Sequence, residues 1–356
     1  MSTKKMTPSG THGLDRRTLL AGAGALGLAS SLPVTSAKAQ AGGRVVVGTW
    51  GGDYARLLTK NVEAPFLVPK GFEVVQDQAS DGPRRAKMRA EARLPRGTSD
   101  IQGLSAANMF EMHQAGLVEA LDYSRIPNAA NLIPAMKYPY GIGHIYSAKV
   151  AVYNPKLTPP PATYKEAFDP KHGSKLGFID IQYQFVMVAA ALANGGSVSN
   201  IEPGKEVLLA AKRAGARIYP TNEAFAQALK TEEIHVGCMW KARVVQWQNA
   251  GISVDSTVPN EGVPFYISGF SIPKNSPNKA GAYAYMNAML EKDAQENFAI
   301  DMGFNPTVTN ATVAPDLQKR IGFTPDEQKR LIDLDYAYLD KNDAAMKDWW
   351  DKVFKA

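Results

Sequence analysis

The sequence has few of the cysteine and histidine residues that form disulfides or bind metal ions. Its single cysteine, Cys238, cannot close an intramolecular disulfide, and we expect it to be a small apolar residue inside a buried strand. Its five histidines show neither H-x-x-H nor H-E-x-x-H spacing, which disfavours a histidine metal centre. No apolar run reaches the roughly 20 residues that span a bilayer. These absences argue against a disulfide scaffold, a zinc enzyme and a membrane-spanning protein.

Charge of neither sign dominates the chain beyond its first 39 residues. The formal net charge is +6, but residues 1–39 carry five basic residues and one acid, which leaves +2 for the remainder. A nucleic-acid or membrane-surface protein needs a larger basic excess, so we expect no nucleic-acid partner. Arg84 and Arg85 lie among many charged residues, and we expect them to be solvated. The 45% hydrophobic and 21% charged content is typical of a globular protein.

The first 39 residues have the order of an export signal. Arg16 and Arg17 precede an apolar run over 18–32, and Ala37-Lys38-Ala39 fits an A-x-A cleavage site. The arginine pair resembles a twin-arginine signal, the type that exports folded proteins, so we expect the twin-arginine export machinery as a partner. We predict a signal peptide over 1–39, cleavage near Ala39, and a periplasmic mature protein without a membrane span.

Strands and helices alternate in the mature part. The patterns predict strands over 44–47, 72–75 and 100–104, each followed by a helix, with a further strand and helix over 175–193. Such alternation indicates a mainly parallel sheet with helices on both faces. The sequence therefore predicts an α/β fold.

Two further strands, over 146–153 and 263–272, are placed to cross between two α/β units. Two crossings would make a hinge. We therefore predict two doubly wound lobes, the first formed by 40–148 plus 270–356 and the second by 149–269.

The C-terminal region contains a clear helix start. Thr324 to Glu327 forms a capping box with proline at the first helical position, and we expect a long helix to follow. The aromatic and apolar residues at the end of the chain recur at helical spacing, so we expect them to pack onto the body rather than bind a partner: Trp349, Trp350, Val353 and Phe354.

Ligands of open parallel sheets bind beyond the carboxyl ends of the strands, so the strand-to-helix turns are the candidate site. Trp50 stands at the first turn, as a ligand platform or as a packing residue, and Asp53 is a helix N-cap or a ligand contact. Ser105, at the second, can cap its helix and offer a hydroxyl. Asp180, at the third, can meet an amine or cap the next helix.

The fourth turn, Trp240-Lys241-Ala242-Arg243, breaks a local rule. A helix N-terminus is effectively positive, so Lys241 and Arg243 in the first turn cost roughly 0.3–1 kcal/mol each. A bound carboxylate or phosphate would turn these cations and the free N–H groups into an anion cradle, and Arg243 could hold a carboxylate bidentately. The alternative is a salt bridge from Arg243 to an acid of the protein, such as Glu232 or Glu261.

At these residues the chain resembles the periplasmic solute-binding proteins of ABC importers, in the polyamine-type branch of the two-lobed family. The likeness covers nearly the whole mature chain and rests on these segments: 45–54, 99–122, 152–154, 177–180, 238–240, 262–273 and 303–307. It implies a periplasmic binding protein type II fold that closes on one small solute and docks on the transmembrane subunits of a permease. It also implies a monomer without a cofactor.

The resemblance places the pocket on these residues: Trp50, Ser105, Asp180, Trp240, Arg243, Tyr266, Ser268 and either Phe304 or Asn305. Polyamine binders have carboxylates where Arg243 and Ser268 stand, so a diamine becomes a poor ligand. An arginine here resembles relatives that take amino acids such as γ-aminobutyrate. We predict a small carboxylate-bearing solute held by Arg243 and Lys241, with any amine received by Asp180, Asp53 or a tryptophan ring.

Three alternatives remain open. The first is polyamine binding, as in the rest of the branch. The second is ferric-ion binding, although the tyrosines form no adjacent pair and Tyr283, Tyr285, Tyr336 and Tyr338 lie in expected helices. The third is a twin-arginine-exported cofactor enzyme, but the mature chain has no G-x-S-x-G elbow and no dinucleotide fingerprint after a strand. We therefore expect a binding protein and not an enzyme.

Overall fold

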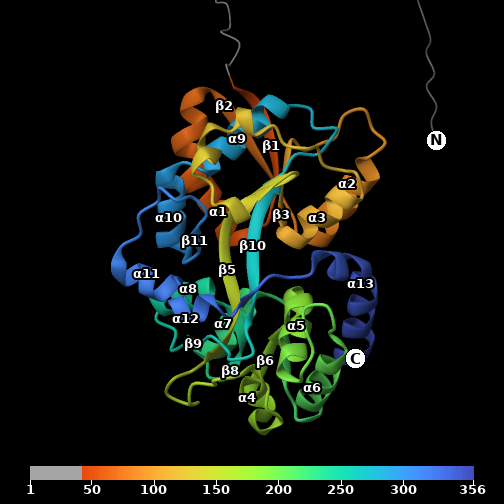
Figure 1. Cartoon of the computed structure of the whole chain (residues 1–356), viewed down its shortest axis with the longest axis vertical. Coiled ribbons are helices and arrows are strands. Elements are labelled where there is room, and N and C mark those ends of the chain that lie inside the picture. The colour runs from red at the N-terminus through yellow and green to blue at the C-terminus, as the bar shows by residue number, and fades with distance from the viewer. Residues whose placement is uncertain (1–41) are drawn as a thin grey trace, which may run out of the picture. The chain divides into compact units, whose positions relative to one another are not determined.

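Two long strands, β5 (Gly141–Tyr153) and β10 (Val263–Ser271), run side by side through the computed structural model, which describes residues 42–356 (Figure 1). They pair antiparallel, and the strand order along the sheet is β2-β1-β3-β10-β5-β8-β6-β7. β10 and β5 therefore stand between two groups of strands, as predicted for the two crossings. The predicted export signal and its cleavage site near Ala39 lie outside the described residues.

The first group of strands is parallel. β1 (Gly43–Thr49) pairs with β2 (Phe72–Gln78) on one side and with β3 (Ile101–Ser105) on the other, and β3 pairs antiparallel with β10. The helices of this group are α1 (Gly52–Leu58), α2 (Asp81–Glu91), α3 (Ala106–Gln114), α9 (Lys279–Met289) and α10 (Lys292–Met302). The three strands predicted here are confirmed, and each is followed by a helix.

The second group continues from β5. β8 (Val236–Trp240) is antiparallel to β5, whereas β6 (Leu176–Ile179) is parallel to both β8 and β7 (Arg217–Tyr219). Its helices are α4 (Tyr164–Ala167), α5 (Tyr183–Ala193), α6 (Glu202–Arg213), α7 (Asn222–Lys230) and α8 (Lys241–Asn249). Cys238 is fully buried in β8, as expected.

Short elements complete the sheet edges and the connections between the groups. They are β4 (Lys137–Tyr138), β9 (Asp255–Thr257), β11 (Asn305–Pro306), β12 (Leu331–Ile332), α11 (Pro315–Ile321) and α12 (Pro325–Gln328). The predicted capping box at Thr324 and Glu327 is present, but the predicted long helix after it is wrong. α12 has four residues, and the chain then passes through β12 before α13 (Tyr336–Trp349) begins.

The C-terminal segment packs on the second group of strands. Trp350 and Phe354 are fully buried, with the ring of Phe354 5.7 Å from that of Phe178 on β6, whereas Val353 stays 42% exposed. In Figure 1, α13 lies beside α5, which it contacts together with α3. The packing role predicted for the two buried aromatics is confirmed. The lobe boundaries remain a prediction, although this segment shares its hydrophobic core with residues assigned to the second lobe.

Among residues 42–356, no helix combines the length and the apolar character that a bilayer crossing requires.

Candidate functional site

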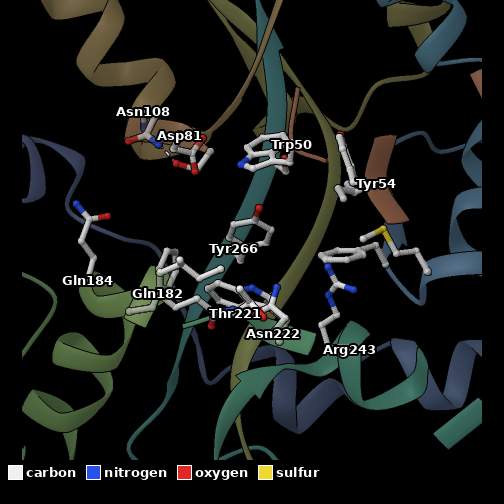
Figure 2. Close-up of a pocket in the computed structure, with 18 of the residues that line it drawn as sticks. Trp50, Tyr54, Asp81, Asn108, Gln182, Gln184, Thr221, Asn222, Arg243 and Tyr266 are labelled. Atoms are coloured by element: carbon white, nitrogen blue, oxygen red, sulfur yellow. Dashed lines mark hydrogen bonds between the residues drawn. The ribbon is translucent and has the colours of Figure 1, made fainter. Parts of the chain in front are cut away.

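A cavity of about 270 Å³ lies beside β10, where the first turns of several helices meet. It is bordered by the starts of α1, α2 and α3 from the first group and of α5, α7 and α8 from the second. Figure 2 shows Trp50 and Tyr54 on one side, Arg243 and Asn222 on the other, and Tyr266 between them. This is the position that parallel sheets dictate, because their helices begin where the strands end.

The cavity brings together six of the ten residues proposed for the site from the sequence. These are Trp50, Ser105, Trp240, Arg243, Tyr266 and Ser268. Phe304, the other choice beside Asn305, also lines it. Ser105 has both of its proposed roles, because its hydroxyl caps α3 by accepting the Asn108 N–H at 3.3 Å while the residue borders the cavity.

Arg243 reaches the cavity from the first turn of α8 with its side chain 11% exposed. Nη1 donates to Oε1 of Gln246 at 2.7 Å. The nearest carboxylate oxygens, on Asp53 and Glu223, both lie 4.0 Å from Nη1, beyond hydrogen-bond distance. Nε is buried and has no hydrogen-bond partner among the described residues. The guanidinium therefore retains donors that no protein acid satisfies.

Burial lowers the pKa of Arg243, and the carboxylates of Glu223 and Asp53, each 4.0 Å away, only partly oppose that effect. The group still carries its charge at neutral pH because an arginine begins from so high a pKa. Among residues 42–356, neither Glu232 nor Glu261 pairs with Arg243, and the salt bridge to a protein acid that the sequence left open is represented only by the 4.0 Å approaches of Asp53 and Glu223. Glu261 instead accepts the backbone N–H groups of Tyr164 and Lys165.

Both tryptophans of the cavity already contact a cation of the protein. The guanidinium carbon of Arg84 lies 4.6 Å from the ring centre of Trp50, and Nζ of Lys149 lies 4.8 Å from that of Trp240. Arg84 and Lys149 are 2% and 0% exposed. The expectation that Arg84 is solvated is wrong, because its buried guanidinium donates to the backbone carbonyls of Ala79, with Nε 2.9 Å from the oxygen, and of Gly103.

Arg85 was also expected to be solvated, and that expectation is wrong as well. Its side chain is 17% exposed and forms an ion pair with Glu111 of α3, while Asp343 of α13 lies 3.8 Å away. The neighbouring arginines thus serve different elements: Arg84 supports the Trp50 side of the cavity, and Arg85 ties α2 to α3.

Aromatic rings form the floor between the two sides. Trp240 and Tyr266 stack with ring centres 4.3 Å apart and an interplanar angle of 23°, and Phe185 meets Trp240 edge-on at 4.5 Å. Trp240 is only 6% exposed. A ring with this little free surface acts as a wall, and it offers little room for a ligand cation.

Tyr54 and His144 form a buried pair behind Trp50. The Tyr54 hydroxyl lies 2.9 Å from Nδ1 of His144, and burial lowers the pKa of His144 to about 3. Nε2 of His144 and Oγ of Ser268 are buried without a hydrogen-bond partner in the described part of the chain. The imidazole is therefore neutral across the physiological range and adds no charge to the cavity.

The model of the bacterial extracellular solute-binding protein family matches residues 64–325. The chain belongs to this family. The spermidine/putrescine-binding periplasmic protein of Escherichia coli (strain K12) is 26% identical to this solute-binding protein over 223 residues, which cover 58% of this chain and 63% of the relative. The chain thus spans less than two thirds of that relative's length.

Solved structures share the fold over nearly their whole length. The Atu4243-GABA receptor superposes with a TM-score of 0.77 at 21% identity, covering 88% of this chain and 98% of the receptor. The PBP MotA of A. tumefaciens B6, in complex with glucopine, gives a TM-score of 0.75 at 19% identity, covering 87% of this chain and 99% of MotA. The predicted two-lobed periplasmic binding protein fold is confirmed.

Asp53 of this solute-binding protein lies just outside the cavity lining. Gly51 occupies the N-cap of α1, so the N-cap role predicted for Asp53 is wrong. Its Oδ2 accepts from Nε2 of Gln246 at 2.6 Å, and its Oδ1 pairs with Arg56 at 3.1 Å. Gly52 at this turn has φ +67°, a conformation that favours glycine.

Lys241 and Asn305 point to the connection that follows α11. Lys241 is 9% exposed and its Nζ donates to the carbonyl oxygen of Gly322, while Nδ2 of Asn305 donates to that of Ile321 at 3.0 Å. Neither residue lines the cavity. Their side chains anchor a loop, and the first turn of α8 offers Arg243 alone as a cation to the cavity.

Asp180 is turned away from the cavity as well. Its carboxylate accepts hydrogen bonds from Nε1 of Trp350 at 2.7 Å and from Nζ of Lys355 at 2.8 Å. No helix cap is made by its side chain. The side chain that follows a strand end can thus point away from the cavity as well as into it.

A ring of neutral polar residues around the cavity was not predicted from the sequence. They are Asn108, Gln182, Gln184, Thr221 and Asn222, accompanied by Tyr54, Asp81 and Glu223. Most stand within the first turn of a helix, so the rule that selected Trp50 and Arg243 also applied to them. Their polar side chains gave no further signal, because such residues are common at any helix start.

Residues 42–356 contain no group of three or more His, Cys, Asp or Glu side chains arranged to hold a metal ion. The tyrosines considered for ferric ion lie in α9 and α13, and none of them lines the cavity.

Proposed function

We propose that the protein is the substrate-binding component of an ABC importer and captures a small carboxylate-bearing organic solute, such as a γ-aminobutyrate-like amino acid or an organic acid. The observation that carries the proposal is Arg243: a guanidinium at the cavity wall, 11% exposed, with a buried unpaired Nε and no carboxylate oxygen closer than 4.0 Å. A charge this buried is strongly stabilised when a ligand carboxylate pairs with it.

The other charges around the cavity favour the same sign of ligand. Arg84 and Lys149 are buried behind the two tryptophans and bring positive potential to both walls. Asp81 is already paired with Arg84 at 2.9 Å, and Glu223 is 69% exposed, where water screens it. The buried cations therefore outweigh the available anions.

Polyamine binding is the second candidate, favoured by the carboxylates of Asp81 and Glu223 at the cavity and by the binding named for the Escherichia coli relative. A diamine would bring two further cations to walls that hold three. A γ-aminobutyrate-like solute avoids half of this conflict, because its carboxylate could pair with Arg243 while its amine meets Asp81 or Glu223.

In this proposal the protein acts by binding and not by catalysis. The lobes, over 40–148 plus 270–356 and over 149–269, close on the solute about the β5–β10 hinge and then dock on the permease. We place the mature protein in the periplasm, delivered by the twin-arginine signal over 1–39. N-terminal sequencing of the protein from a periplasmic fraction tests this, and a start far from residue 40 would contradict it.

Native mass spectrometry of the purified protein, followed by thermal melting with single solutes, tests the ligand class. The solutes are γ-aminobutyrate, glutarate, glycine betaine, benzoate and putrescine. A solute at about 1,000 times its dissociation constant adds about 4 kcal/mol to the free energy of unfolding, which is an easily measured shift. Stabilisation by putrescine alone would overturn the carboxylate assignment.

Arg243→Ala completes the test. Loss of the charge should weaken the best carboxylate by about 2–5 kcal/mol if the ion pair is buried in the closed form. Arg56→Ala is the matched control, because Arg56 pairs at 3.1 Å with the same Asp53 that lies 4.0 Å from Arg243, whereas the Arg56 side chain is 62% exposed. Equal affinities in the two variants would remove Arg243 from the site.

A further inference from the structure

Lys149 is a buried cation behind Trp240 whose hydrogen bond leads toward the cavity. It lies in the middle of β5, is 0% exposed, and does not line the cavity. Its Nζ donates to Oε1 of Gln182 and lies 4.8 Å from the ring centre of Trp240. Within residues 42–356 no carboxylate forms an ion pair with it, although burying an ammonium without one is costly.

The hydrogen bond from Lys149 sets the direction of a chain that ends at the cavity. An ammonium group has only donors, so the Gln182 atom that faces it must be the amide oxygen. The amide nitrogen of Gln182 then points the other way and donates to Oδ1 of Asn222 at 2.6 Å. The Asn222 amide must therefore keep its NH2 group as its free end.

The Lys149 ammonium fixes an amide orientation that shape alone does not fix. The oxygen and nitrogen of an amide are nearly the same size, so a hydrogen-bond network normally decides which is which. Here the Lys149 ammonium, which has only donors and stands at the end of the series of hydrogen bonds, decides which amide atom is the oxygen. Burial lowers the pKa of Lys149 to about 8, so the ammonium form prevails at neutral pH and the direction holds there.

Asn222 stands at the cavity beside the candidate anion site. It borders the cavity at the first residue of α7, and the next residue, Glu223, has its Oε1 4.0 Å from Nη1 of Arg243. Figure 2 shows Gln182 and Asn222 on the same side of the cavity as Arg243. A donor fixed here complements the guanidinium, whereas a flipped amide would present an acceptor.

We propose that Lys149 is a positioning residue: through Gln182 it holds the Asn222 amide with its NH2 group toward the cavity, so that Asn222 and Arg243 both offer donors to the acceptor-bearing end of the solute. The same ammonium also contacts Trp240, which stacks on Tyr266 and is nearly covered. That ring is thereby lost as a platform for a ligand amine. Naming the ligand end rests on the proposed function, but the direction of the amide chain does not.

The direction of the chain is measured without any ligand. The full mature chain is labelled with 15N at asparagine and glutamine side chains, and exchange of their NH2 protons with water is followed at pH 6.5. Asn222→Ala and Gln182→Ala assign the two signals by their loss. We expect slow exchange for the Gln182 NH2, which is bonded to Asn222, and fast exchange for the Asn222 NH2. The opposite order overturns the proposal.

Gln182→Glu reverses the direction of the hydrogen bond between residues 182 and 222. A carboxylate has only acceptors, so in Gln182→Glu the Asn222 amide must turn its NH2 toward the new carboxylate, and its fast-exchanging signal should become slow. An unchanged Asn222 signal would contradict the relay. Lys149→Met should let both amides flip, with loss or splitting of the slow Gln182 signal, and backbone spectra report whether this variant folds. If it does not fold, Gln182→Glu still decides the question.

Ligand affinity provides the functional arm, with γ-aminobutyrate and glutarate as probes. Asn222→Ala should weaken whichever probe binds by about tenfold, the usual effect of one lost hydrogen bond to a charged group. Asn222→Asp, which replaces the donor with acceptors, should weaken it further. Wild-type affinity in both variants would overturn the role of Asn222. If neither probe binds the wild type, the proposed ligand class fails, and the exchange experiment still decides the amide direction.

Discussion

Oδ1 of Asp180 accepts a hydrogen bond from the indole nitrogen of Trp350 at 2.7 Å, joining residues 170 positions apart in the chain. Oδ2 of the same carboxylate pairs with Lys355 at 2.8 Å. Trp350 is fully buried, so its N–H would have no access to water if the carboxylate were removed. Asp180 therefore holds the C-terminal segment against the second group of strands.

Asp180→Ala should lower the free energy of unfolding by about 1–3 kcal/mol, because it leaves the Trp350 N–H buried and unpaired. Solute affinity should stay near the wild-type value. Urea titration and thermal melting with the best solute measure the two effects. Asp351→Ala, which removes an exposed partner of Lys355, is the control and should cost less than about 1 kcal/mol. A large loss of affinity in a variant of normal stability would return Asp180 to the site.

Arg84→Ala should destabilise the protein by about 3–5 kcal/mol, the range for breaking a buried ionic network. The guanidinium is 2% exposed, donates to the Ala79 carbonyl and pairs with Asp81, so its loss strands acceptors behind Trp50. Arg89→Ala on the same helix removes a 47% exposed arginine and should cost about 1 kcal/mol or less. Equal urea midpoints for the two variants would refute the supporting role of Arg84.

Three of the predicted site residues that line the cavity have positions set by local structure. Trp50, Ser105 and Arg243 follow strand ends, and a strand end at the edge of a parallel sheet faces the ligand side whatever else the chain does. The fold class followed from the same local alternation. Tyr266 and Ser268 lie inside β10, and only the resemblance to a family indicated them.

The predicted site residues that do not line the cavity bond to distant segments of the chain. Lys241 bonds to the carbonyl of Gly322, 81 positions away, and Asp180 bonds to Trp350. No local pattern specifies such partners, because a polar side chain at a turn can face either side. The burial of Lys149 could not be predicted from the sequence for a related reason. It depends on how the second group of strands and its helices cover β5.

His144→Gln should reduce the loss of stability in acid. The folded protein keeps the imidazole neutral with a pKa of about 3, whereas the unfolded chain takes up a proton near pH 6.5. The unfolded state thus binds more protons between pH 6.5 and 3, and wild-type stability falls over that window by about 5 kcal/mol from this group. Urea titrations at several pH values check the slope, with His172→Gln as the control. Parallel curves for wild type and His144→Gln would contradict a neutral buried imidazole.

Lys149→Met should change the pH dependence of stability above pH 8, whereas His144→Gln changes it in acid. Burial lowers the pKa of Lys149 from 10.5 to about 8, so between these values the unfolded chain holds a proton that the folded protein has released. Wild-type stability should therefore gain about 3 kcal/mol from this group as pH rises from 8 to 10.5, and Lys149→Met should lack that gain. The measured quantity is the difference in free energy of unfolding between the two proteins at pH 7, 8, 9 and 10. Lys60→Met, at a 57% exposed site, is the control and should give a nearly constant difference. A constant difference for Lys149→Met as well would mean that the ammonium is as well solvated in the fold as in water, which the contacts with Gln182 and Trp240 argue against.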